Sequence, residues 1–291
     1  MKGIVLAGGN GTRLYPATLA INKHFLPVYN KPMIYYPLSV LMLSGIREIL
    51  LISTPRDTGS FKSVLGDGSR LGIKIDYAVQ ERPGGLAEAL IIGEKFINGG
   101  PVCMALGDNI FFGHGLPNVL GKAVSSIEAE GGAHVLAASV PDPERFGIIE
   151  FDAQGKALSV EEKPKKPKSN WAVTGLYFFD GQCSQIAKSI KPSARGELEI
   201  TTVNAHYLEQ GKLKASALGR GFAWFDAGTH DSLIEAGEFI SVIENRTGLM
   251  VGCVEEIAFR NGWIGPDALA AIANSIGLNG YGKYLLSLLK A

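Results

Sequence analysis

The chain has 291 residues, 46% of them hydrophobic, and its 28 lysines and arginines balance its 28 aspartates and glutamates. This length allows one large core, and the zero net charge provides no overall field that would favour nucleic acid or an anionic membrane as a partner. No run of about 18 apolar residues occurs and no secretion signal begins the sequence, so we expect a cytoplasmic protein. No Cys-x-x-Cys spacing occurs, which leaves packing as the expected role of Cys103, Cys183 and Cys253.

The first residues predict a buried strand that ends in a glycine-rich turn. The apolar run IVLA, residues 4–7, passes directly into GGNGTR, residues 8–13. Glycines let several backbone N–H groups converge on an anion, and Arg13 adds a permanently charged fork. A Walker A loop would need Gly-Lys-Ser/Thr here, and the dinucleotide fingerprint would need glycine in place of Leu14. We therefore interpret the turn as a third kind of phosphate-binding loop, with Lys23 in a second polar stretch beyond it.

Strand and helix patterns alternate over the first third of the chain. Residues 33–44 predict a helix, 48–53 a strand, 61–65 a short helix, 73–79 a strand, 86–97 a helix and 102–106 a strand. Such alternation implies a mostly parallel sheet with helices on both faces, in which ligands gather at the carboxyl ends of strands. The glycine-rich turn and Asp108 both follow strand ends.

The middle third changes character. Strand patterns follow one another at 135–140, 147–151, 157–161 and 173–179, with a basic, proline-rich loop at 163–168, which favours a mixed extension of the same sheet. Helices are then predicted at 182–189 and 197–210, strands at 214–218 and 223–225, and helices at 232–245 and 268–290 with a break at 277–282. The last 40 or so residues are expected to form a small helical appendage.

Several motifs resemble those of sugar-nucleotide pyrophosphorylases. The stretch LAGGNGTRLYPATLAINKHFLPVYNKPMIYYPL, residues 6–38, carries the pattern L-A-G-G-x-G-T-R-L-x-P-x-T followed by K-x-x-x-P-x-x-x-K-P. The motifs LGDNIFFGH, VEEKPKKPKSN, ARGELEIT and FAWFDAGTHDSL then follow in the order found in the short bacterial glucose-1-phosphate thymidylyltransferases. The resemblance covers essentially the whole chain. It implies an α/β fold: a Rossmann-like mixed, mostly parallel central sheet with helices on both faces and a small C-terminal helical appendage.

The resemblance also implies an organisation and an activity. It predicts a single nucleotidyltransferase domain over residues 1–291, divided into a nucleotide-binding part (1–110), a sugar-binding part (111–230) and a helical appendage (231–291). The implied reaction transfers dTMP from dTTP to glucose 1-phosphate, giving dTDP-glucose and pyrophosphate, as a first step towards dTDP-L-rhamnose and other deoxysugars. A UTP- or CTP-dependent transferase and a catalytically silent sugar-nucleotide sensor are the alternatives.

Two aspartates at strand ends are candidate metal ligands. Asp108 ends the run VCMALGD, and Asp226 lies in FAWFDAGT. One aspartate at a strand end is commonly a helix cap or turn former. Two of them in one nucleotide pocket would suit Mg²⁺, which prefers a couple of carboxylates together with phosphate oxygens and water. The family's metal aspartates match these two positions, so Mg²⁺ is the expected cofactor.

The remaining site is assigned by the resemblance, residue by residue. Each polar residue also has a plainer interpretation: Gln80 as an exposed strand end, Lys163 as part of a solvated charge cluster, and Arg195 as a surface ion-pair partner of Glu197 or Glu199. The expected catalytic residues are Arg13, Lys23, Lys163, Asp108 and Asp226; the expected nucleotide-binding residues are Leu6, Gly8, Gly9, Gly11, Thr12, Arg13, Gln80, Gly85 and Asp108; and the expected sugar-phosphate-binding residues are Asn109, Gly147, Glu162, Lys163, Val173 and Arg195.

Two positions depart from the family pattern. Relatives that use thymidine triphosphate commonly carry Asp near position 84, where this chain has Gly84, and relatives often have Tyr in place of Phe146.

No general base is expected, because a sugar phosphate is already ionised at neutral pH and catalysis would rest on positioning and electrostatics. The five histidines are accordingly predicted not to act as catalytic bases: His24, His114, His134, His206 and His230.

A regulatory site is the last expectation. Short thymidylyltransferases resemble one another in forming homotetramers with a second, inhibitory nucleotide site at a subunit interface. The matching positions here are Gly45, His114, Gly115, Glu256 and Arg260. The segment CVEEIAFRNGWI predicts a surface helix, for which a plain packing role is an equally good explanation.

Overall fold

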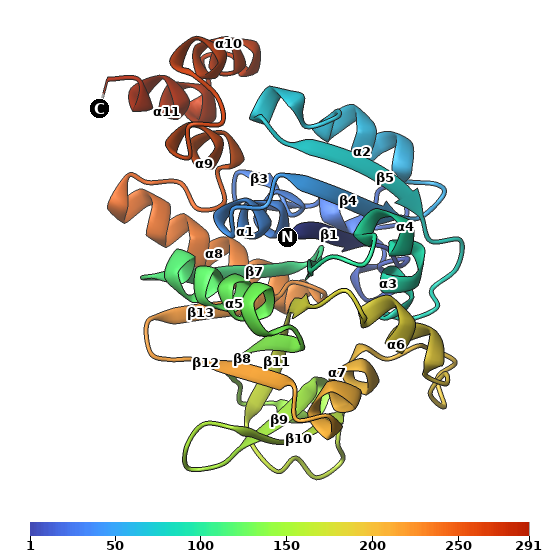
Figure 1. Cartoon of the computed structure of the whole chain (residues 1–291). Helices are drawn as coiled ribbons and strands as arrows, with labels where there is room; N and C mark the ends of the chain where they lie inside the picture. The colour runs from blue at the N-terminus through green and yellow to red at the C-terminus, as the bar shows by residue number, and fades with distance from the viewer. Residues whose placement is uncertain (291) are drawn as a thin grey trace.

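The computed structural model describes residues 1–290. Its centre is a nine-stranded mixed sheet with the order β10-β9-β11-β6-β1-β4-β5, in which β8 also pairs with β11 and β12 pairs with β8 (Figure 1). The strands of this sheet are β1 (Lys2–Ala7), β4 (Glu48–Ser53), β5 (Lys74–Val79), β6 (Val102–Leu106), β8 (Ala133–Ser139), β9 (Gly147–Phe151), β10 (Ala157–Glu162), β11 (Trp171–Phe179) and β12 (Leu213–Leu218).

The N-terminal half of the sheet is parallel, as the alternating pattern predicts. Strand β1 pairs in parallel with both β4 and β6, and β4 pairs in parallel with β5. Side chains along β1 alternate between two cores, because successive residues of a strand point to opposite faces. Val5 contributes to the core that contains α1 (Tyr35–Leu43), α2 (Thr58–Leu65) and α5 (Leu116–Glu130), whereas Ile4 contributes to the core that contains α3 (Glu88–Ile92), α6 (Cys183–Ser189) and α7 (Ile200–Glu209). Both faces are therefore covered by helices, which confirms the fold prediction.

The middle strands extend the same sheet in antiparallel fashion. Strand β11 is antiparallel to β6, β8 and β9, and β10 is antiparallel to β9. The predicted mixed extension is thus correct. Strand β11 joins the two halves, and most of its residues are buried.

Some predicted boundaries were wrong. The helix expected over residues 86–97 is divided at Gly93 into α3 and α4 (Glu94–Ile97). A Cβ at Gly93 would lie 2.8 Å from Cδ1 of Ile4, so the chain passes close to β1 at this point.

Helix α5 was not predicted at all, although Leu116, Leu120 and Ile127 are buried along one face of it. Two short strand pairs were also missed as pairs: β7 (Asn109–Gly113) with β13 (Phe222–Asp226), and β2 (Pro27–Val28) with β3 (Lys31–Pro32).

The C-terminal appendage consists of helices beside the sheet (Figure 1). They are α8 (His230–Thr247), α9 (Val254–Arg260), α10 (Pro266–Ile276) and α11 (Gly280–Leu288). Helix α9 is not the surface helix that was expected, because Val254, Glu255 and Ala258 are buried and Val254 packs into the core that contains α1. Within residues 1–290, no helix is long and apolar enough to cross a membrane. The three cysteines are free and buried, which confirms their packing role.

Candidate active site

A cleft of about 410 Å³ opens at the carboxyl ends of β1 and β6, between them and the strands β9 to β11. The structure brings nearly all of the predicted site residues to this cleft. Of the predicted catalytic, nucleotide-binding and sugar-phosphate-binding residues, only Gly11 and Thr12 do not line it. The predicted residues along its walls are Leu6, Gly8, Gly9, Arg13, Lys23, Gln80, Gly85, Asp108, Asn109, Gly147, Glu162, Lys163, Val173, Arg195 and Asp226.

The glycine-rich turn forms one rim of the cleft. Gly11 adopts a left-handed conformation with φ of 61°, which glycine accepts without strain, and a short 3-10 turn of Thr12 to Leu14 follows it. Thr18 Oγ1 donates a 2.7 Å hydrogen bond to the Gly11 carbonyl and fixes the turn from behind. Arg13 is exposed at the rim, and its guanidinium donates no hydrogen bond to the described part of the chain. Its charge is therefore available to an anion in the cleft.

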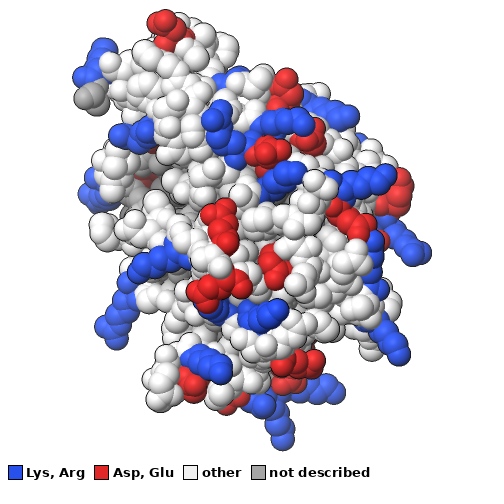
Figure 2. All heavy atoms as spheres, in the orientation of Figure 1, with Lys and Arg blue, Asp and Glu red and all other residues white. Residues whose placement is uncertain are grey.

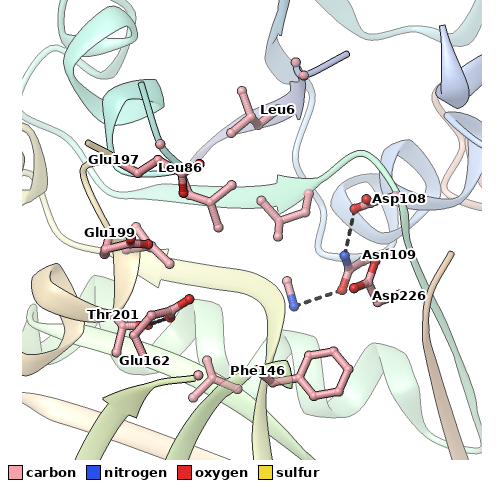
Figure 3. A pocket seen from close by; sticks show the side chains of 18 of the residues that line it. Leu6, Leu86, Asp108, Asn109, Phe146, Glu162, Glu197, Glu199, Thr201 and Asp226 are labelled. Carbon is pink, nitrogen blue, oxygen red and sulfur yellow. Dashed lines mark hydrogen bonds between the residues drawn. The ribbon is translucent and has the colours of Figure 1, made fainter. Parts of the chain in front are cut away.

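Asp108 lies at the end of β6 in a fully bonded environment. Its carboxylate is buried, forms an ion pair with Lys23 and accepts a 3.1 Å hydrogen bond from Asn109 Nδ2 (Figure 3). Burial opposes ionisation, but the Lys23 ammonium and the hydrogen bonds from Lys23 and Asn109 act together against it, and the pKa of Asp108 lies well below its usual range. His24, next to Lys23, is held neutral, because burial and the Lys23 charge lower its pKa to about 3. A neutral imidazole of that kind is a poor proton acceptor.

Asp226 reaches the same place from the other half of the chain. The antiparallel pairing of β13 with β7 sets Asp226 opposite Asn109, and the Ala227 amide donates a 2.9 Å hydrogen bond to the Asp108 carbonyl. Burial and the negative charge of Asp108 raise the pKa of Asp226. No hydrogen bond or ion pair to its carboxylate occurs within residues 1–290. Two neighbouring carboxylates of which one lacks a partner form an environment that favours a cation.

The donor set fits Mg²⁺ better than a metal held by protein alone. No group of three or more His, Cys, Asp or Glu side chains suited to a metal is found among the described residues. Mg²⁺ does not need one, because it is usually bound by one or two carboxylates with substrate phosphates and water as the other ligands. Arg13 lies close by, since a Cβ at Gly228 would be 2.9 Å from Asp226 Oδ1 and 3.1 Å from the central carbon of the Arg13 guanidinium. The fit is to a metal bound together with a phosphate anion.

The opposite wall carries a network of bonded polar side chains (Figure 3). Glu162, at the end of β10, accepts a 2.5 Å hydrogen bond from Thr201 Oγ1 and a 3.1 Å bond from Arg195. Arg195 also donates a 2.9 Å bond to Glu199. Lys163 has a φ of 44°, a left-handed conformation that is unusual for a residue with a side chain. Backbone strain of this kind is often found at functional sites. This wall is held in shape by its own hydrogen bonds.

Asn109 makes more hydrogen bonds within the protein than its predicted contact with the sugar phosphate implies. Its Nδ2 donates to Asp108, and its Oδ1 accepts hydrogen bonds of 3.0 Å from the Gly175 amide and 2.6 Å from Trp224 Nε1. Because Asn109 is buried and bonded on both sides, it orients Asp108. Its predicted contact with a sugar phosphate stays a prediction.

Several residues that line the cleft were not predicted from the sequence as site residues. Trp224 and Thr201 lie within the recognised motifs FAWFDAGTHDSL and ARGELEIT, so membership of a motif was the available signal for them, whereas Arg145 and Tyr177 gave none. These additional residues are His24, Pro83, Leu86, Leu106, Arg145, Gly175, Tyr177, Glu197, Glu199, Ile200, Thr201 and Trp224, together with Phe146.

The predicted regulatory residues lie away from this cleft. Gly45 follows α1 with a φ of 78°, and Gly115 precedes α5. On α9, Arg260 donates a 2.6 Å hydrogen bond to Glu256. Over the face drawn in Figure 2, basic and acidic side chains alternate without forming a field of one sign.

Comparison with known proteins gives the family. The nucleotidyl transferase family model matches residues 2–242. A glucose-1-phosphate thymidylyltransferase of Neisseria meningitidis is 57% identical over 100% of both chains. One of Xanthomonas campestris is 56% identical over 99% of this chain and 97% of its own length, and one of Mycobacterium tuberculosis is 51% identical over 100% and 99%.

Solved structures agree with the sequence relatives. A Bacillus anthracis protein described as a glucose-1-phosphate thymidylyltransferase, in complex with a sucrose, is 44% identical and superposes with a TM-score of 0.75 over 82% of this chain and 94% of its own. A UDP-glucose pyrophosphorylase complexed with UDP-glucose has a TM-score of 0.72 at 24% identity over 83% of this chain and 98% of its own, which shows the shared fold alone. The chain therefore belongs to the nucleotidyl transferase family. Within that family it groups with the glucose-1-phosphate thymidylyltransferases, which match it over its full length.

Proposed function

We propose that the protein transfers dTMP from dTTP to α-D-glucose 1-phosphate and releases dTDP-glucose and pyrophosphate. The full-length identity to glucose-1-phosphate thymidylyltransferases supports this reaction. The observation that carries it is the meeting of two carboxylates, the buried Asp108 and the half-buried Asp226, beside the glycine-rich turn and Arg13. That arrangement suits a reaction in which two polyanions must approach each other.

The chain's own residues account for binding and orientation. An oxygen of the sugar phosphate attacks the α-phosphorus of dTTP in line, and the bond from that phosphorus to the pyrophosphate oxygen breaks. Arg13 stabilises the departing pyrophosphate, while Lys163 and Arg195 orient the attacking phosphate. Since the attacking oxygen carries no proton at neutral pH, no side chain has to accept one, and a neutral His24 is compatible with that.

Asp108 and Asp226 would hold Mg²⁺ in this proposal. When bound, Mg²⁺ supplies positive charge that neutralises the phosphate oxygens during transfer. Lys23 keeps Asp108 ionised and so keeps it competent as a ligand. The same proposal makes this reaction the first step towards dTDP-L-rhamnose. It also places the reaction in the cytoplasm, where nucleoside triphosphates are abundant.

One assay tests the proposal and its alternatives together. The purified protein is incubated with Mg²⁺, each of dTTP, UTP, CTP and ATP, and a panel of sugar 1-phosphates, while pyrophosphate release is followed. We expect the highest kcat/KM for dTTP with glucose 1-phosphate. A preference for UTP or CTP would move the activity to the uridylyl- or cytidylyl-transferases. Binding by titration calorimetry without any pyrophosphate release would instead indicate a sugar-nucleotide sensor.

Assembly and regulation are part of the proposal as well. We propose a homotetramer with a second nucleotide site near Gly45, His114, Gly115, Glu256 and Arg260, at which a dTDP-sugar end product inhibits. Light scattering measures the assembly, and kinetics at saturating dTDP-rhamnose measure the inhibition. A monomer in the first experiment or unchanged kinetics in the second would contradict the corresponding part.

A further inference from the structure

The side chain of Gln80 is held in one orientation by two acceptors. Gln80 follows β5 and lines the cleft, where the side chain is almost completely buried. Its Nε2 donates a 2.6 Å hydrogen bond to Glu88 Oε2 and a 3.3 Å bond to the Gly85 carbonyl. A carboxylate and a carbonyl can only accept, so the amide must turn its amino group towards both of them. The usual ambiguity between the two ends of a glutamine amide is removed here by its neighbours.

The other end of the amide faces the nucleotide side of the cleft. A Cβ at Gly8 would lie 2.5 Å from Gln80 Oε1, which places this oxygen against the glycine-rich turn. Gly8 and Gln80 line the same cleft. Both protons of Nε2 are used by Glu88 and Gly85, so the group that Gln80 presents to a ligand is an acceptor.

Glu88 occupies space that Gly84 leaves open. Glu88 begins α3 and does not itself line the cleft. A Cβ at Gly84 would lie 2.5 Å from Glu88 Cδ and 2.7 Å from Glu88 Oε1, so the carboxylate rests over this glycine. The loop is fixed on its other side, because the Leu198 amide donates a 2.8 Å hydrogen bond to the Gly84 carbonyl. The carboxylate at position 88 therefore depends on the absence of a side chain at position 84.

We propose that Glu88 determines base selectivity as a positioning residue, by fixing Gln80 so that an acceptor faces the base. This rests on the proposed nucleotidyl transfer at the same cleft. Thymine and uracil carry an N–H donor at N3, which a fixed acceptor can bond. Cytosine has a lone pair at N3, which a fixed acceptor repels, and a site built for one hydrogen-bonding pattern discriminates against the other. Glu88 thus favours thymidine and uridine triphosphates over cytidine triphosphates.

The test is a selectivity ratio in Glu88→Gln. An amide at position 88 can donate as well as accept, so Gln80 becomes free to turn over. We expect the ratio of kcat/KM for dTTP to that for dCTP to fall about tenfold, the size of one hydrogen bond, while the ratio of dTTP to dUTP stays unchanged. Glu209→Gln, which removes an exposed carboxylate at the end of α7, is the matched control and should leave both ratios at the wild-type value.

A rescue variant separates positioning from folding. Gly84→Asp combined with Glu88→Gln returns a carboxylate to the same space from the neighbouring position, and we expect it to restore the dTTP to dCTP ratio. An unchanged ratio in Glu88→Gln with an unchanged melting temperature would overturn the inference, as would a wild-type protein without preference for dTTP over dCTP. If the wild type released no pyrophosphate at all, the proposed function would fail, and Kd values of dTTP and dCTP from titration calorimetry would decide the role of Glu88 by the same ratio.

Discussion

The two walls of the cleft are built differently. On the nucleotide wall, Arg13 makes no hydrogen bond within the described residues, and Asp226 likewise lacks one. On the sugar wall, Glu162, Arg195 and Thr201 are already bonded to one another. Within residues 1–290, Arg13 and Asp226 therefore have no partner until a ligand binds, whereas Glu162, Arg195 and Thr201 are positioned before any ligand arrives. We infer that Arg13 and Asp226 take the charge of the triphosphate and its metal, and that the second wall orients the sugar phosphate.

The largest effect is expected from the two aspartates. Asp108→Asn should lower kcat on the order of 10³-fold, because a neutral amide cannot supply the negative charge that would hold Mg²⁺ beside the phosphates. Asp226→Asn should lower kcat similarly. Pyrophosphate release at limiting Mg²⁺ measures both. Near-normal activity of Asp108→Asn would show the metal assignment to be wrong.

Stability distinguishes the same two aspartates. Asp108 is ion-paired with Lys23, so Asp108→Asn leaves a half-buried ammonium without its partner and should lower the melting temperature. Asp226 is a half-buried carboxylate, and partial burial together with the like charge of Asp108 raises its pKa. Asp226→Asn removes that repulsion and should raise the melting temperature while activity falls, as expected where a functional site stores unfavourable interactions. A lower melting temperature for Asp226→Asn would contradict this interpretation of the nucleotide wall.

The next effect compares an arginine from each wall. Arg13→Ala should lower kcat/KM about 10²-fold with little change in the melting temperature, because the exposed side chain has no hydrogen bond or ion pair within the described residues to lose. Arg195→Ala should raise the KM for glucose 1-phosphate and should also destabilise the fold by up to about 1 kcal/mol, since it leaves Glu162 and Glu199 unneutralised. Urea unfolding at neutral pH measures the second quantity. Equal destabilisation by both variants would remove the distinction between the walls.

The comparison also shows what the sequence could predict. Features that lie in one short segment were predictable: an apolar strand, the glycine-rich turn that ends it, and Arg13 within the turn. The parallel half of the sheet followed from the alternation of strand and helix patterns. Helix α5 was missed although its buried residues recur at helical spacing and Pro117 lies in the first turn, where proline is favoured, because Gly121 weakens the local helix pattern.

Contacts between distant segments could not be predicted from the residues. The pairing of β7 with β13 brings Asp226 to Asp108, but no local pattern states which strand pairs with which. Thr201 falls within a predicted helix, and its position in the sequence does not indicate the 2.5 Å hydrogen bond from its Oγ1 to Glu162 Oε2. Glu88 likewise gave no signal, because its importance lies in a hydrogen bond to Gln80 and not in its own pattern.

A smaller effect is expected on the sugar wall. Thr201→Val keeps the shape of the side chain and removes the hydroxyl that donates to Glu162. Glu162 then loses one of the bonds that fix it, so the KM for glucose 1-phosphate should rise about tenfold while the KM for dTTP stays unchanged. Initial-rate kinetics with each substrate varied in turn measure both constants. A parallel rise in the KM for dTTP would mean that the two walls do not act independently.

The last effect concerns acid stability, to which two buried histidines contribute: His24 in the 3-10 turn Lys23–Phe25 and His134 on β8. Burial and Lys23 lower the pKa of His24 to about 3, and burial and Lys214 lower that of His134 to about 4. In the unfolded chain both titrate near 6.5, so below that pH the unfolded state binds protons that the folded state does not. The free energy of unfolding should therefore decrease between pH 6.5 and 5 by up to about 1.4 kcal/mol per pH unit for each histidine. His134→Phe should reduce this slope by about half, as measured by urea unfolding across the same range. A slope equal to that of the wild type would show that His134 does not remain neutral in the folded protein.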